Sequence, residues 1–322
     1  MPIRVLGSCG GFGSDISDGM LWAAGISVPG LPDNPNPAEV LNMSLGSGGQ
    51  TTCPGLYQDA INQVNAAGSI IVVAAGNANG NAANYTMSAC NGVISVGATR
   101  ITGGKASYSN YGARVDISAP GGGGSADGNP GGYVWQVTNG GTQGPVAGNW
   151  ILRGSAGTSM ASPHQAGAAG LIRQARPGWS VPEIKSALAL TAKTEVFKED
   201  SVTPGTPFDK GSGRVQVDRA INAGLVMHET TANYQAANPA TGGDVSALNQ
   251  PSLANRNCYS SCSFVRTFRN PHGSASSWRI RFTGVNATAS PAVLKVPAGG
   301  WVPLVLGVAL FTLMMKIGRA SC

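Results

Sequence analysis

The chain has 322 residues, a formal net charge of +6, 47 glycines and only 11% charged residues, against about 25% in typical globular proteins. So little charge indicates a fold that depends on close backbone packing rather than on ion pairs. The basic residues are spread along the sequence and do not cluster with aromatic residues, which argues against a nucleic-acid-binding protein. The six cysteines suggest an oxidising compartment, so we expect a secreted, monomeric globular protein.

The first part of the chain alternates between helical and strand patterns. Helices are expected over residues 14–24 and 57–67, the second with apolar residues at helical spacing. Strands are expected over residues 40–46 and 69–77, and the second is a continuous apolar run, which is typical of a buried parallel strand. This alternation predicts an α/β fold with a doubly wound, mostly parallel sheet.

Two local signals refine this prediction. Residues 138–141, TNGG, are typical of a β-hairpin and indicate one between short strands near 133–137 and 150–153. Residues 180–183, SVPE, form a capping box with proline in the first turn, which predicts a helix that ends near Ala192.

After residue 227 the composition becomes rich in Asn, Ser, Thr and Pro. Short strands such as 264–268 and 278–282 predict the start of a fibronectin-like β-sandwich. The expected domains are therefore residues 1–227 and 228–316.

The end of the chain has two unusual stretches. Residues 301–315 form an apolar run interrupted by Pro303 and Gly307, and this run is shorter than the roughly 20 residues of a membrane-spanning helix. A sandwich strand or frame-shifted sequence is favoured over a membrane span. Residues 317–322, IGRASC, can be reverse-translated into the start of a common sequencing adapter, so we expect them to be an artefact.

The most informative stretch is residues 157–164, GTSMASPH, followed by a helical run of small and apolar residues. Ser159 is expected at the positive end of this helix, where backbone N–H groups stabilise the negative charge of an oxyanion. A helix cap alone would explain Thr158 and Ser159 but not the rest of the segment. The lack of bulk and charge after it predicts that the helix runs through a tightly packed interior.

This segment resembles the serine motif of the subtilisin-like serine proteases, the subtilases. Residues 106–121 and the two strand segments 40–46 and 69–77 extend the resemblance in the family's order, over roughly residues 1–225. The match is nearest to the proteinase K-like and related secreted bacterial branch. It implies a subtilisin-like fold and a serine endopeptidase that cleaves polypeptides through an acyl-enzyme on Ser159.

The resemblance also assigns roles to individual residues. Asn77 would donate its amide N–H to the oxyanion, and the alternative is a turn-forming asparagine. Two backbone segments would bind an extended peptide: Ser44, Leu45 and Gly46, and Ala74, Ala75 and Gly76.

A serine needs a histidine base and an orienting carboxylate, and the family carries both before its serine. The chain has only three histidines, His164, His228 and His272. His164 belongs to the serine motif and is interpreted as structural, while the other two are predicted to be surface residues. Residues 1–7 resemble the strand that follows the family's histidine helix. We therefore expect an amino-terminally truncated fragment whose catalytic Asp and His lie upstream.

Four of the cysteines are expected to form two disulfides. Cys53 precedes a predicted helix and Cys90 follows the apolar strand. A disulfide between them would therefore stabilise the wall of the substrate cleft. Cys258 and Cys262 suit a tight loop disulfide. Cys9 is then left for a partner upstream, as in the family branch. A metal site at either pair of cysteines is disfavoured, because no second pair of Cys or His residues lies near it in the sequence.

No cofactor is expected for the chemistry, but the resemblance implies a structural calcium site. Asp116, with the carbonyl oxygens of Asn91 and Val93, matches calcium-binding positions of the proteinase K-like branch. The alternative is a strand-end aspartate that caps a local turn.

The sequence leaves two function classes open. The first is a serine endopeptidase, inactive as this fragment because the base is missing. The second is a non-catalytic peptide- or surface-binding protein that holds peptides along residues 44–46, and the missing histidine favours it. Intact Asn77 and Ser159 favour the protease, because a pure binder has no chemical need for both.

Overall fold

The computed structural model describes residues 1–309 and 315–316, apart from residues 8, 48, 50, 143, 256, 257, 259 and 260. The chain forms two compact units. The first comprises Met1–Gly167 with Lys193–Arg214, and the second comprises Ala168–Ala192 with the described residues from Val215 onward. The predicted division after residue 227 stays a prediction.

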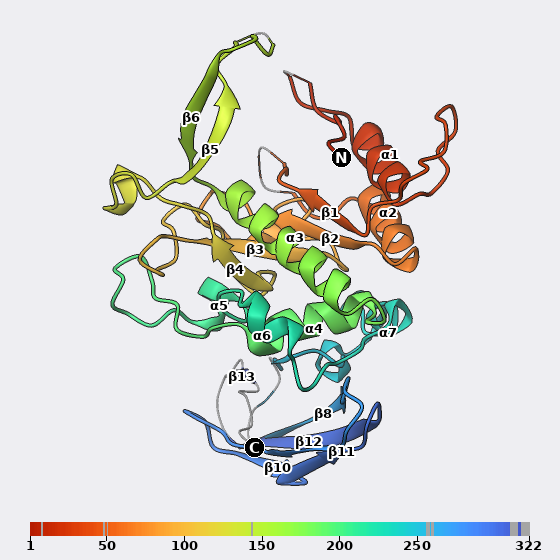
Figure 1. The fold of residues 1–322 in the computed structure, drawn as a ribbon. Coiled ribbons are helices and arrows are strands. Elements are labelled where there is room, and N and C mark those ends of the chain that lie inside the picture. Colours follow the sequence, from red (N-terminus) through yellow and green to blue (C-terminus); the bar gives the residue numbers. More distant parts are fainter. Residues whose placement is uncertain are drawn as a thin grey trace. The chain divides into compact units, whose positions relative to one another are not determined.

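A parallel four-stranded sheet forms the centre of the first unit. Its strands lie in the order β1 (Val40–Met43), β2 (Ile70–Ala74), β3 (Ile94–Thr99) and β4 (Ile117–Pro120). Every residue of β2 and β3 is buried, as expected for central strands covered on both faces. The carboxyl ends of all four strands lie at one edge of the sheet (Figure 1).

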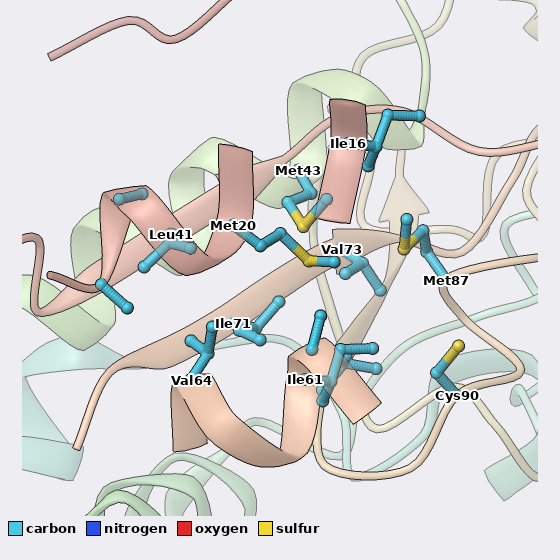
Figure 2. Close-up of a cluster of buried hydrophobic side chains, with 14 residues drawn as sticks. Ile16, Met20, Leu41, Met43, Ile61, Val64, Ile71, Val73, Met87 and Cys90 are labelled. Carbon is cyan, nitrogen blue, oxygen red and sulfur yellow. The ribbon is translucent and has the colours of Figure 1, made fainter. Parts of the chain in front are cut away.

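Two helices cover one face of this sheet, α1 (Gly13–Ala23) and α2 (Gly55–Ala66). In register, Leu41 is paired with Ile71 and Met43 with Val73, so these side chains point to the same face. They pack there with apolar residues of both helices, including Ile16, Met20, Ile61 and Val64 (Figure 2). Both helices start within two residues of the predicted positions.

The predicted hairpin is confirmed. Strands β5 (Val134–Asn139) and β6 (Trp150–Ser155) pair antiparallel, and residues 140–149 connect them. The Asn139 side chain holds this connection together by hydrogen bonds. Its Oδ1 accepts from the N–H groups of Gly141 and Val146, at 2.9 and 2.8 Å, and its Nδ2 donates to the Val146 carbonyl at 2.7 Å. An asparagine whose side chain bonds across the loop thus holds the two strands together at their connection.

Helix α3 (Thr158–Ala175) follows β6, as predicted, but it is not enclosed on all sides in the described structure. Ala161, Ser162 and Gln165 are buried, whereas Pro163 and His164 are exposed. The prediction of a helix through the interior is therefore wrong for one of its faces. The small residues of α3 allow one face of this helix to lie close to the parallel sheet.

Short elements complete the first unit. They are η1 (Ala82–Asn84), η2 (Ser125–Asp127) and α5 (Pro207–Lys210).

Helices and antiparallel strands build the second unit. The capping box is confirmed, because Ser180 and Glu183 bond reciprocally at the start of α4 (Val181–Thr191). The remaining helices are α6 (Val217–Ile221), α7 (Thr231–Ala236), η3 (Pro239–Thr241) and η4 (Val245–Ala247). The strands are β7 (Ser252–Leu253), β8 (Ser261–Arg269), β9 (Ser276–Arg279), β10 (Ala287–Ser290), β11 (Val293–Val296), β12 (Trp301–Ala309) and β13 (Met315–Lys316).

These strands form the sheets β10-β12-β8, β11-β9 and β13-β7. The predicted strand 264–268 lies within β8. The strand predicted at 278–282 corresponds to β9, which begins at Ser276 and ends at Arg279, where its pairing with β11 ends. The apolar run predicted from residue 301 is strand β12 as far as Ala309; residues 310–314, and the expected artefact at 317–322, lie outside the described residues. Within the described part of the chain, no helix has the length and apolar character needed to cross a bilayer.

Candidate active site

Ser159 is the second residue of α3 and is half-buried. Its hydroxyl donates to the carbonyl oxygen of Ser44 at 3.3 Å, and the hydroxyl of Ser44 donates to the carbonyl oxygen of Ser159 at 2.8 Å. Ser44 follows the end of β1, so the sheet edge and the helix start meet at these two residues. The structure therefore brings the predicted nucleophile against the first residue of the predicted substrate segment.

Asn77 lies three residues after the end of β2 and is exposed. Its Oδ1 accepts from both the backbone N–H and the hydroxyl of Thr158, each at 2.8 Å. The Thr158 hydroxyl in turn accepts from the N–H of Gly76 at 3.1 Å. Because Oδ1 is held by two donors, the Nδ2 group points away from Thr158, and it lies 3.3 Å from where a Cβ on Gly157 would be. The amide donor of Asn77 therefore lies beside the loop that carries Ser159.

Asn110 holds the loop that carries Asn77, a role that the sequence analysis missed. Its side chain is completely buried. Its Nδ2 donates to the Ala75 carbonyl at 2.8 Å, and its Oδ1 accepts from the N–H groups of Ala78 and Gly80 at 3.0 and 2.9 Å. Gly76 has φ +105°, and a Cβ there would lie 2.3 Å from Asn110 Nδ2, so only glycine fits. The available signal was a polar residue within the motif segment 106–121.

The two predicted substrate segments lie at the same edge of the sheet. Ser44, Leu45 and Gly46 continue from β1, and Ala75 and Gly76 continue from β2, whose last residue is Ala74. A further contact fixes the first of these strands to α3. The Ser162 hydroxyl donates to Asn42 Oδ1 at 2.6 Å, which the sequence analysis also missed.

Tyr108 connects the serine loop to the end of β4. Its hydroxyl donates to the carbonyl oxygens of Gly121 and Gly122 at 2.9 and 2.6 Å, and the N–H of Gly157 donates to the Gly121 carbonyl at 2.9 Å. Burial raises the pKa of the Tyr108 phenol well above its ordinary value, because the ionised form would be desolvated. The neutral phenol therefore persists as a donor at this position.

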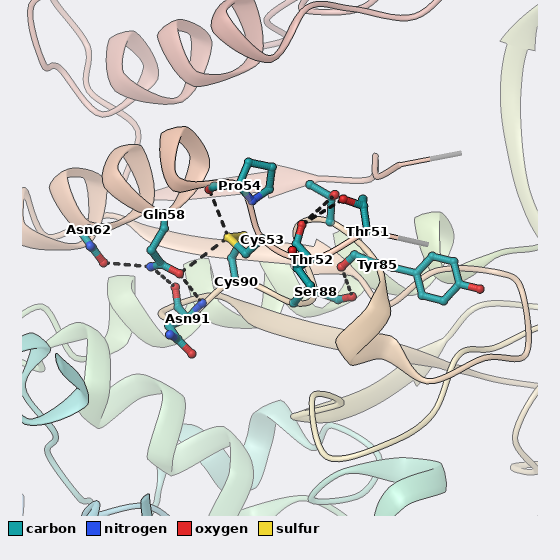
Figure 3. The surroundings of a disulfide bond; sticks show 12 residues. Thr51, Thr52, Cys53, Pro54, Gln58, Asn62, Tyr85, Ser88, Cys90 and Asn91 are labelled. Carbon is teal, nitrogen blue, oxygen red and sulfur yellow. Dashed lines mark hydrogen bonds between the residues drawn. A yellow bond between two sulfur atoms is a disulfide. The ribbon is translucent and has the colours of Figure 1, made fainter. Parts of the chain in front are cut away.

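A disulfide joins Cys53, just before α2, to Cys90, with a Cα–Cα distance of 4.9 Å (Figure 3). Gln58 reinforces the bridge, since its side chain bonds the N–H and the carbonyl oxygen of Asn91 at 2.8 and 3.1 Å. In the second unit, Cys258 and Cys262 form the other disulfide, with a Cα–Cα distance of 5.6 Å.

Each of the three histidines, all of which the structure describes, bonds to a group other than Ser159. His164 is exposed, and its Nδ1 lies 2.7 Å from the Met160 carbonyl of the preceding turn. The other two histidines, predicted to be surface residues, are half-buried and hydrogen-bonded. His228 Nδ1 lies 3.1 Å from the Ser180 hydroxyl, and His272 Nε2 lies 3.2 Å from the carbonyl oxygen of Ala223.

The residues around Asp116 fit calcium poorly. Asp116 Oδ2 accepts from the N–H of Ser95 at 2.7 Å, and the Asn91 carbonyl already accepts from Gln58. Arg114 donates to the Asn91 side chain and to the backbone carbonyls of residues 88–90, so a guanidinium charge already occupies this loop. No group of three or more His, Cys, Asp or Glu residues gathers anywhere in the described structure. Calcium prefers six to eight oxygen ligands, including several carboxylates.

The fold and the site together define an α/β protein in which a helix-terminal serine and an asparagine donor meet at the carboxyl edge of a parallel sheet. The chain belongs to the subtilase family, whose sequence profile matches residues 1–224. Its fold in this region is accordingly subtilisin-like.

Relatives of known name agree with this assignment. The extracellular basic protease of Dichelobacter nodosus is 40% identical over 227 residues, which are 70% of this chain and 34% of that protein. The extracellular protease of Xanthomonas campestris pv. campestris is also 40% identical over 227 residues, 70% of this chain and 35% of that protein. A solved protease from Pseudoalteromonas arctica has a TM-score of 0.62 and 44% identity, over 69% of this chain and 62% of that one. The chain thus spans about a third of the length of the two curated relatives.

Proposed function

We propose that this chain carries the nucleophile and the oxyanion donor of a secreted serine endopeptidase. The observation that carries the proposal is the pair of hydrogen bonds from Thr158 to Asn77 Oδ1, which fixes the orientation of the Asn77 amide beside the loop of Ser159. Membership of the subtilase family supports the reaction class. The two disulfides, and relatives that are named extracellular proteases, support secretion.

In the proposed reaction, an extended polypeptide pairs with the backbone of residues 44–46 and 74–76. The oxygen of Ser159 attacks the scissile carbonyl carbon, and its proton passes to a base and then to the leaving amine. The Asn77 amide and the N–H of Ser159, at the positive end of α3, stabilise the tetrahedral oxyanion. Water then hydrolyses the acyl-enzyme.

The general base is the part that residues 1–322 lack in this proposal. Each histidine bonds to another group, and the hydroxyl of Ser159 donates to the Ser44 carbonyl instead of to a base. An unactivated serine keeps its proton near neutral pH. We therefore propose that these residues, acting alone as a monomer, hydrolyse peptides very slowly.

A fluorophosphonate probe tests this function. We expect slow labelling that is confined to Ser159, absent in Ser159→Ala, and retained in the control Ser125→Ala, which changes an exposed serine outside the site. Labelling at other serines would contradict the assignment of the nucleophile. Rapid labelling of Ser159 would show that a base lies within this chain.

A non-catalytic peptide-binding protein is the second candidate, and the bond from Ser159 to Ser44 favours it. This candidate requires that a peptide binds along residues 44–46 and that Ser159 is never labelled, even with excess probe.

Two finer assignments accompany the proposal. We propose that the strands after β7 begin a fibronectin-like sandwich, since β8, β11 and β12 share one buried core. We propose that Asp116 caps a local turn and holds no calcium, because the fit is poor, and we expect no rise in melting temperature when calcium is added at millimolar concentration.

A further inference from the structure

The hairpin formed by β5 and β6 has one apolar face that is left in water. In its register, Trp135 is opposite Gly154, Val137 is opposite Leu152, and Asn139 is opposite Trp150, so these side chains lie on one face. The four large apolar side chains there have the following exposed fractions: Trp135 52%, Val137 71%, Trp150 67% and Leu152 66%. We call these four residues the hairpin's apolar face.

The opposite face of the hairpin is more polar. It carries Gln136, Thr138 and Arg153, together with Ile151. An amphipathic ribbon normally buries its apolar side against another layer, but here it is the apolar side that remains exposed.

The apolar face is preorganised rather than loose. The Trp135 indole N–H donates to the Gly131 carbonyl at 2.9 Å, and the ring of Tyr133 meets the indole edge-on, with centroids 6.0 Å apart. A Cβ on Gly154 would lie 3.2 Å from the indole, so the ring rests against the backbone of the paired strand. A rigid aromatic side chain loses little entropy on binding, which is why Trp is common among the residues that dominate interfaces.

The hairpin is also continuous with the candidate active site. Strand β6 ends at Ser155, four residues before Ser159, and Val134 at the base of β5 is paired with Ser155. Figure 1 shows the hairpin extending away from the parallel sheet beside the first turn of α3. The apolar face therefore belongs to the segment of chain that leads directly into the serine loop.

We propose that the hairpin's apolar face binds an apolar stretch of the polypeptide substrate, as a second attachment point outside the cleft. This proposal rests on the proposed function of the site. Residues 133–155 contain Arg153 as their one charged residue, and it lies on the opposite face, so neither an acidic partner nor an anionic lipid surface is attracted to the apolar face. Backbone pairing in the cleft is largely independent of sequence, whereas this face selects for apolar side chains.

The test measures binding in the Ser159→Ala background, so that it does not depend on turnover. The probes are an unstructured peptide rich in Leu, Val and Phe and a length-matched peptide rich in Ser and Gln, titrated by calorimetry. The double substitution Trp150→Ser with Leu152→Ser should weaken binding of the apolar peptide by about tenfold or more, as for central interface residues. The matched control, Gln136→Ser with Thr138→Ser on the opposite face, should leave this affinity unchanged.

A further variant keeps the test decisive if the double variant fails to fold. Trp150→Phe preserves an apolar ring and should retain the affinity for the apolar peptide within roughly threefold. Equal affinity of the double variant and its control, or no preference for the apolar peptide, overturns the proposal. So does tighter binding to phosphatidylcholine vesicles than to the peptide, or a dimer in sedimentation that the double variant abolishes.

These results are separable from those of the proposed function. If the probe labels Ser159 but the hairpin variants bind like the unsubstituted chain, only the docking surface is refuted. If the apolar peptide binds at the hairpin but Ser159 is never labelled, only the catalytic assignment is refuted.

Discussion

Replacing Asn110 by alanine should unfold the loop that carries Asn77 before it affects the rest of the chain. The substitution removes three hydrogen bonds of 2.8 to 3.0 Å made by a completely buried side chain, to the Ala75 carbonyl and to the N–H groups of Ala78 and Gly80. At roughly 0.5–1.5 kcal/mol for each bond, the expected loss is about 2–4 kcal/mol. Hydrogen exchange followed by mass spectrometry on peptides covering residues 74–82 should show opening increased by roughly 30- to 1,000-fold.

Asn139 provides the matched control, because its side chain also makes three hydrogen bonds to backbone groups but is only half-buried. Water replaces those bonds when Asn139 is changed to alanine, so exchange in the hairpin loop should rise by less than about tenfold, near the cost of one net hydrogen bond. Comparable exchange increases for the two variants would refute the argument that burial of the Asn110 bonds sets their importance.

Three further predictions concern the candidate site. Asn77→Ala should slow phosphonylation of Ser159 by roughly 10²–10³, a range taken from removing one oxyanion donor in subtilisin, a relative of this chain; an unchanged labelling rate would make Asn77 a turn residue. Opening the Cys53–Cys90 disulfide, whose sequence separation is 37, should lower the unfolding free energy by roughly 4 kcal/mol in urea titrations, against roughly 2 kcal/mol for Cys258–Cys262 with a separation of 4. Tyr108 has a folded-state pKa raised above the unfolded value of about 10, so its contribution to stability is complete below pH 10 and is lost as the pH rises toward the folded pKa. Between about pH 10 and 12, the unsubstituted chain should therefore lose more stability than Tyr108→Phe, and parallel losses would contradict this.

Local sequence patterns were sufficient where a short segment determines its own structure. The apolar run before Asn77 is a buried strand, and the capping box at Ser180 opens a helix, because propensity and local hydrogen bonding decide both. The placement of Ser159 in the first turn of α3 follows from the same kind of local signal.

The features that the sequence analysis missed depend on contacts between distant segments. Asn110 bonds to the loop after β2, and Ser162 bonds to Asn42. The spacing of residues within either segment does not predict these bonds. The hairpin itself was predicted, but the bonds between the Asn139 side chain and Val146 that hold its loop depend on a contact that the TNGG pattern does not contain. The half-buried positions of His228 and His272 likewise depend on tertiary packing.

The bridge between Cys53 and Cys90 also changes what a single cut in the backbone can do. The closed ring contains α2, β2 and Asn77, and residues 77–79 within it are exposed, as are the loop tips at which peptidases cut. A cut there adds one molecule of water to the chain but releases no fragment, since both new ends remain covalently joined through the two sulfur atoms. The part of the molecule that holds the candidate oxyanion donor can therefore be nicked and still remain assembled until a reductant opens the ring.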